Sequence, residues 1–222
     1  MTPNPRPQSG PALRELDPDR PQDVRAVARM HLDLLSWGPM AGLGLPFLEG
    51  YCYRVLVRDG LMNAALAEVD GRPAGFVVYT GRPGGFLSQA LRRHPWRAAA
   101  AVLASLAARP QAFLKLGRAV SAPLFHLSGR AASLPMAEGE ILAIGVYPEY
   151  RSLPFLQATG RRIGRELYDH ALSRLRALGK RSVHMDVDAF NREALLFYHA
   201  LGGRFQAFRR GADDMYRILF EL

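Results

Sequence analysis

The sequence has very little cysteine: Cys52 is the single one in 222 residues. One thiol cannot form an internal disulfide or a cysteine-rich metal cluster, and it favours a reducing compartment. The six histidines lack the paired spacing that is typical of metal-binding motifs. We therefore predict a cytoplasmic protein without a metal site.

Long hydrophobic runs are absent as well. Residues 1–11 have no apolar core of the kind that a signal peptide needs, and we expect them to form a disordered arm. The longest apolar run, residues 98–108, is about half of the roughly 20 residues that a membrane-spanning helix needs. We expect a soluble protein without membrane contact.

Acidic residues are missing between Asp70 and Glu138. That gap holds nine basic residues, which match the whole formal excess of +9: Arg72, Arg82, Arg92, Arg93, Arg97, Arg109, Lys115, Arg118 and Arg130. The basic character therefore belongs to one segment. Aromatic residues do not alternate with basic ones there, so we expect no nucleic-acid partner.

What is present is an ordinary globular composition, with 49% hydrophobic and 22% charged residues. We expect one domain over residues 12–222 with a large insertion at 81–136. Hydrophobic periodicity predicts strands over 12–16, 63–69, 74–79, 138–146, 182–187, 205–208 and 215–222. It predicts helices that start near Asp17, Leu45, Gly160 and Asn191. The fold class is α/β with a mixed sheet.

The insertion at 81–136 reads as three helical stretches, 86–94, 95–108 and 110–120. The interpretation that we favour is a helical elaboration packed on the domain with solvated arginines. A basic amphipathic face toward a membrane surface or an acidic partner, and a lid over a substrate pocket, stay open. If it flanks the acceptor side, its positive field would favour neutral or acidic acceptors.

Three segments contain candidate binding and catalytic residues. The turn Thr159-Gly160-Arg161-Arg162-Ile163-Gly164 leads into a helix, whose free N–H groups and dipole attract phosphate. The strand Leu142-Ala143-Ile144-Gly145-Val146 has a glycine where a bulge could splay the sheet. Asn191-x-x-Ala194-x-x-x-Tyr198 fits a capped helix with Tyr198 two turns along the same face.

Together these segments resemble the acetyl-CoA-binding half of the GNAT acetyltransferase superfamily. The resemblance implies a mixed, mostly antiparallel sheet flanked by helices, with the insertion between the third and fourth strands. It implies acetyl-CoA as co-substrate. The implied cofactor-binding residues are Ile144, Gly145, Val146, Thr159, Gly160, Arg161, Arg162, Ile163, Gly164 and Asn191. The chain departs from the family turn at Thr159 and Arg162, and residues 152–158 are inserted before it.

The resemblance also implies catalytic roles. Tyr198 would protonate the departing thiolate, and Glu140 is the candidate base that takes the proton of the amine. The acceptor is a small-molecule or peptide amine, and a homodimer stays open. Two alternatives remain: transfer of a longer acyl chain, and a catalytically inactive CoA-binding module that docks an acidic partner or a membrane.

Overall fold

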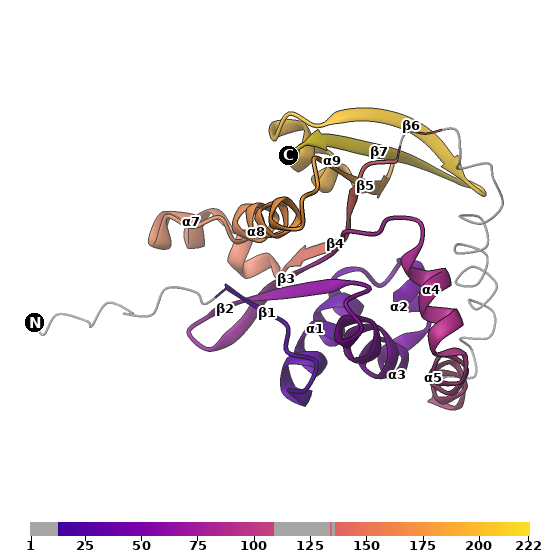
Figure 1. Cartoon of the computed structure of the whole chain (residues 1–222). Coiled ribbons are helices and arrows are strands. Elements are labelled where there is room, and N and C mark those ends of the chain that lie inside the picture. The colour runs from indigo at the N-terminus through magenta and orange to yellow at the C-terminus, as the bar shows by residue number, and fades with distance from the viewer. Residues whose placement is uncertain (1–12, 109–133, 135) are drawn as a thin grey trace, which may run out of the picture.

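The computed structural model describes residues 13–108, 134 and 136–222 (Figure 1). The expected arm at 1–11 and the third expected helix of the insertion, 110–120, lie outside these residues. The other two expected helices of the insertion are present as α4 (Phe86–Arg93) and α5 (Pro95–Ala108). Two of the three helices expected between the third and fourth strands are therefore present.

A mixed sheet of seven strands runs through the molecule in the order β1-β2-β3-β4-β5-β7-β6. Every neighbouring pair is antiparallel except β4 and β5, which are parallel. The strands are β1 (Leu13–Glu15), β2 (Asn63–Val69), β3 (Arg72–Thr80), β4 (Gly139–Val146), β5 (Ser182–Asp188), β6 (Arg204–Arg210) and β7 (Asp213–Glu221). The predicted fold class is confirmed.

The hairpin of β2 and β3 forms where the sequence predicts it. Asp70 and Gly71 join the strands with φ of 51° and 73°, the left-handed pair that matches the twist of a two-residue hairpin. Side chains of β3 then alternate between the two faces, with Phe76 and Val78 in one core and Val77 and Tyr79 in the other. The strand is apolar on both faces because helices cover both.

Helices flank the sheet on its two sides (Figure 1). One face carries α1 (Pro21–Leu34), α2 (Pro39–Gly42), α3 (Gly44–Phe47) and the π-helix η1 (Leu48–Leu56). The other carries α8 (Ile163–Ala177) and α9 (Arg192–Ala200). On α8 the predicted stripe of Ile163, Leu167, Ala171 and Leu175 is buried, and each such side chain contributes roughly 1–3 kcal/mol. Leu178, the fifth predicted member, lies beyond the helix and is 56% exposed.

The segment between β4 and α8 is more structured than the sequence suggested. A 3₁₀ turn, η3 (Pro148–Arg151), is followed by the short helix α7 (Leu153–Thr159), which the Ser152 hydroxyl caps by accepting from Phe155 N. Gly160 ends α7 with φ of 69°. In the part of the chain that the structure describes, no helix has the length and apolarity that crossing a membrane requires.

Candidate active site

The parallel strands β4 and β5 separate after a short stretch of pairing. They are paired at Gly139 with Val183 and at Glu140 with His184, and at no later residue of the two strands. We call the point where the two strands separate the fork. Beyond it, the half-buried residues of β4 up to Val146 pair with β3 along one edge, and β5 no longer covers the other edge. An extended ligand could therefore add to the free edge of β4 through backbone hydrogen bonds.

The bulge in β4 lies at Leu142, and the prediction of a bulge at Gly145 is wrong. Val78 pairs with Ala143 and Tyr79 with Ile141, which leaves Leu142 as the extra residue, whereas Gly145 pairs regularly with Phe76. The glycine has a packing role instead. A Cβ there would lie 2.9 Å from Phe76 Cε1 and 3.0 Å from Leu34 Cδ1, so glycine lets α1 pack onto the sheet.

The N-terminus of α8 lies beside the open end of the fork. No side chain caps it, so the first N–H groups, those of Ile163 and Gly164, are available to an anion. A Cβ on Gly164 would face Val146 Cγ2 at 3.8 Å and Phe197 Cε2 at 4.0 Å. Gly164 therefore borders both the end of β4 and the helix α9.

The other residues of the predicted phosphate turn differ in whether their polar groups are free to bind a phosphate. The Thr159 hydroxyl donates to Phe155 O and accepts from Arg161 N, and Gly160 ends α7. The Arg161 guanidinium donates to both carboxylate oxygens of Glu166 on α8. Arg162 is exposed, and within the described ranges its guanidinium has no hydrogen bond or ion pair. It is thus the arginine of this turn that a phosphate could recruit without breaking a contact.

Asn191 caps α9 as the sequence predicts, because its Oδ1 accepts from Ala194 N at 3.2 Å. Tyr198, farther along α9, is 2% exposed and packs among Tyr168, Phe197 and Phe220. Burial raises the pKa of Tyr198 above its usual value, so the phenol stays protonated at neutral pH. Among the described residues its hydroxyl has no hydrogen-bond partner, yet it is not one of the fully enclosed polar atoms.

Glu140 lies at the vertex of the fork with its side chain 12% exposed. Desolvation raises the pKa of this carboxyl to about 7, and the nearby charge of Asp186 acts in the same direction. Its Oε1 is 3.8 Å from His184 Nε2. Glu138, two residues earlier, differs from it: it is half exposed and paired with Arg181. A carboxyl that titrates near neutrality can take up a proton in this pH range.

A buried ion-pair network lies beside Glu140 on β5, β6 and β7. Asp186 accepts from Arg217 at 2.8 and 3.0 Å and also from Arg210. Burial alone would raise the pKa of Asp186, but these two arginines outweigh it and hold the pKa below its usual value. Glu140, His184 and Asp186 offer ligand atoms within 4.8 Å of one another. Because two guanidinium groups already neutralise Asp186, this cluster disfavours a divalent cation.

The structure adds an aromatic pair that the sequence analysis missed. Trp37, after α1, makes an edge-to-face contact with Phe190, after β5, at 5.9 Å between ring centroids. Both rings are at least half exposed. Trp37 also makes a side-chain hydrogen bond with Asp188 at the end of β5. Aromatic residues that follow directly after a helix or a strand belong to no periodic pattern, so no sequence pattern pointed to this pair.

His184 and Asp186 were also missed. They alternate on β5 with the buried Val183, Met185 and Val187, so the pattern of polar residues within an interior strand was the signal that could have identified them.

Comparison with known proteins agrees with this geometry. Residues 127–202 match the model of the acetyltransferase (GNAT) family. None of the curated proteins is similar enough in sequence to count as a match. A polyamine N-acetyltransferase from Drosophila melanogaster, which forms N-acetylagmatine, is 16% identical with a TM-score of 0.52, covering 96% of this chain and 100% of its own.

Two further structures have the same arrangement. PaiA N-acetyltransferase from Thermoplasma acidophilum, in complex with coenzyme A, is 14% identical with a TM-score of 0.50, covering 94% of this chain and 98% of its own. The ribosomal-protein-S18-alanine N-acetyltransferase from Escherichia coli is 13% identical with a TM-score of 0.50, covering 96% and 94%. The chain therefore has the fold of these N-acetyltransferases, and its residues 127–202 match the model of the GNAT acetyltransferase family.

Proposed function

We propose that the protein transfers an acetyl group from acetyl-CoA to an amine. The observation that carries this proposal is the end of β4–β5 pairing at Glu140, which leaves an open strand edge with a base of pKa about 7 at its vertex. The N-terminus of α8 borders the same opening through Gly164. We infer that these features line one groove, which would offer an edge for an extended arm, donors for phosphates and a group that can take a proton.

Acetyl-CoA would lie along this groove. The backbone of Ile144, Gly145 and Val146 would pair with the pantetheine arm. The N–H groups of Ile163 and Gly164 would bind the pyrophosphate, and Arg162 would add positive charge. Asn191, at the start of α9, borders the groove from its other side. We assign Thr159, Gly160 and Arg161 a supporting role, because their polar groups or conformation already serve α7 and α8.

The reaction would be a direct transfer without a covalent enzyme intermediate. Glu140, directly or through a water molecule, takes a proton from the ammonium of the acceptor. The neutral nitrogen attacks the acetyl carbonyl carbon and a C–N bond forms. The nitrogen, now positively charged, releases its second proton to water, and the C–S bond breaks. Tyr198 donates its proton to the departing thiolate. The phenol is protonated before the step, but its raised pKa makes it a weaker acid, so the transfer requires direct contact between the hydroxyl and the thiolate.

The acceptor would enter from the face that carries Trp37 and Phe190. Exposed aromatic faces and the nearby carboxylate of Asp188 suit an amine that arrives as a cation. The similar structures act on acceptors as different as a polyamine and a ribosomal-protein alanine, as their names state. A small-molecule amine and a peptide N-terminus both remain within the proposal.

An acceptor screen that follows CoA release tests the proposal. Purified protein is incubated with acetyl-CoA and with longer acyl-CoAs against polyamines, amino acids and short peptides. We expect turnover with acetyl-CoA and at least one amine class. Turnover with longer chains alone would establish the acyltransferase alternative. Tight CoA binding with no turnover on any acceptor would instead favour the inactive CoA-binding module.

A further inference from the structure

Helix α5 exposes an apolar face to solvent. Its inner side, which includes the buried Ala98 and Ser105, packs on α3 and η1. Eight of the described side chains of α5 are exposed, and all except Arg97 are apolar: Pro95, Trp96, Ala99, Ala100, Leu103, Ala104 and Ala107. Trp96 is 85% exposed and Leu103 is 65% exposed. A solvent-facing helix side normally carries polar residues, so this face lacks the composition expected for contact with water alone.

Three arginines lie close in sequence to the beginning of this face. Arg92 and Arg93 form the last turn of α4, and Arg97 lies in the first turn of α5 beside Trp96. All three are exposed, and in the described part of the chain none of them is paired with a carboxylate. The sequence has no acidic residue between Asp70 and Glu138 that could pair with them locally. The charge is therefore available to an anionic partner.

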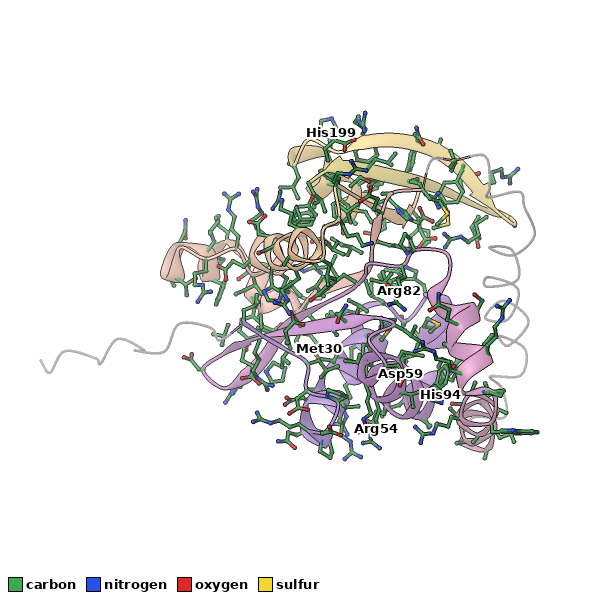
Figure 2. The ribbon with its side chains drawn as sticks, in the orientation of Figure 1. Met30, Arg54, Asp59, Arg82, His94 and His199 are labelled. Atoms are coloured by element: carbon green, nitrogen blue, oxygen red, sulfur yellow. The ribbon has the colours of Figure 1, made fainter. Side chains whose placement is uncertain are left out.

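The α4–α5 unit is fixed to the body of the protein. His94, between the two helices, contacts the carboxylate of Asp59 just after η1, and the two lie next to each other in Figure 2. Ala90 and Ala98 are buried against the same core. In Figure 1, α5 lies at the edge of the molecule, across the sheet from α8. The apolar face is thus held rigidly and points outward.

We propose that this face, with its arginines, docks the protein on an anionic phospholipid bilayer. Trp96 and Leu103 would enter the interfacial layer while Arg92, Arg93 and Arg97 contact lipid phosphates. A bilayer fits better than an acidic protein, because four of the exposed apolar side chains are alanine methyl groups, which offer a partner protein few specific contacts. The expectation of no membrane contact rested on the lack of a spanning run, and docking in the membrane plane needs none.

Tryptophan fluorescence can report this contact directly. The sequence has two tryptophans, so Trp37→Phe leaves Trp96 as the only indole. Vesicles of phosphatidylcholine with phosphatidylglycerol should shift the Trp96 emission to the blue and co-sediment the protein. Vesicles of phosphatidylcholine alone should do so far more weakly, and added salt should reduce binding to the anionic vesicles.

Two sets of variants separate the charge from the apolar contact. Replacing Arg92, Arg93 and Arg97 together by Gln should weaken binding on the order of a hundredfold, as expected from about 1 kcal/mol per arginine and 1.4 kcal/mol per tenfold. Leu103→Ser should weaken it roughly tenfold. Leu153→Ser is the matched control, because Leu153 is 64% exposed but lies on α7.

The outcomes are distinct. All these side chains project into solvent, so thermal melts should show that each variant is folded. Absence of binding to anionic vesicles by the folded parent protein overturns the proposal. Binding that Leu153→Ser reduces as much as Leu103→Ser also overturns it. A solution dimer that Leu103→Ser dissociates, with no vesicle binding, would assign the face to a second copy of the chain instead.

Discussion

Glu140 on β4 and His184 on β5 form the last residue pair that joins these two strands, with Glu140 Oε1 3.8 Å from His184 Nε2. Beyond this pair the strands separate, and the backbone of β4 offers its edge to a ligand. The vertex therefore combines a carboxyl of raised pKa with the opening in which the proposed thioester would lie.

Replacing Glu140 by Gln should lower kcat by about 10²–10⁴-fold, the usual contribution of a general base. In the parent enzyme the rate should rise with pH through about 7, where Glu140 loses its proton, and the variant should lack this rise. Steady-state kinetics from pH 5.5 to 9 measure both. Glu138→Gln serves as the matched control, since Glu138 is half exposed and paired with Arg181. Equal effects at both positions would remove Glu140 from the mechanism.

Glu140 should also affect stability. Its contribution to the free energy of unfolding should fall with rising pH, whereas the reaction rate should rise. Its pKa is about 7 when folded and 4.5 in the reference state, so the folded chain retains the proton over a wider range. The free energy of unfolding should therefore contain a contribution that declines as pH rises from about 4.5 to 7. In urea unfolding across this range, Glu140→Gln should lose less stability, or gain more, with rising pH than the parent protein does. An unchanged slope would mean that Glu140 ionises normally in the fold.

Tyr198→Phe should preserve the fold and acetyl-CoA affinity but slow turnover by about 10²–10⁴-fold, because only the acidic proton is lost. Tyr168→Phe is the natural comparison: Tyr168 belongs to the same aromatic cluster, with ring centroids 6.1 Å apart. The measurement must use an acceptor for which chemistry limits the rate. If both variants turn over like the parent enzyme, Tyr198 is a core aromatic.

Acetyl-CoA should stabilise the protein against heat, by roughly 2.7 kcal/mol at a hundred times its Kd. Gly164→Leu should abolish this shift, because the new side chain would project between Val146 and Phe197 into the groove. Gly50→Leu is the control, at a helical glycine with nothing within 4 Å of its built Cβ. Thermal melts with and without ligand compare the two. A full shift in Gly164→Leu would exclude the α8 N-terminus from the cofactor site.

The two arginines of the turn before α8 should differ in their effect on cofactor binding. Arg162→Gln should raise the Kd for acetyl-CoA about tenfold and weaken its salt dependence, since this guanidinium is free to reach a phosphate. Arg161→Gln should change the Kd little, because Arg161 already donates to Glu166. Calorimetric titrations at two salt concentrations measure the Kd of each variant. A larger increase in Kd for Arg161→Gln than for Arg162→Gln would contradict the assignment.

Asp186→Asn should destabilise the fold by about 3–5 kcal/mol, because the 1% exposed Arg217 would lose its carboxylate. The folded pKa of Asp186 is lowered, so its stabilisation is present above the unfolded pKa near 4 and is lost as pH falls through the lower folded value. Asp169→Asn, which breaks a half-exposed pair with Arg165, should cost at most about 1 kcal/mol. Urea unfolding of both variants at neutral pH tests the difference.

The sequence by itself determined the features that depend on neighbouring residues. The left-handed pair Asp70 and Gly71 fixes a hairpin, the 3.6-residue stripe of α8 fixes which side is buried, and Asn191 fixes the start of α9. Each of these signals acts over a few residues, through backbone sterics, periodicity or capping. The order of the elements followed from them, and with it the mixed sheet.

Only the tertiary structure decided where the strands part and what surrounds the vertex. The bulge lies at Leu142 because β3 sets the register, and Gly145 is needed for the approach of Leu34 from α1. The raised pKa of Glu140 comes from burial beside Asp186, 46 positions later in the numbering, and Trp37 meets Phe190 from the opposite half of the chain. These properties arise from packing between segments distant in sequence, which no local pattern encodes.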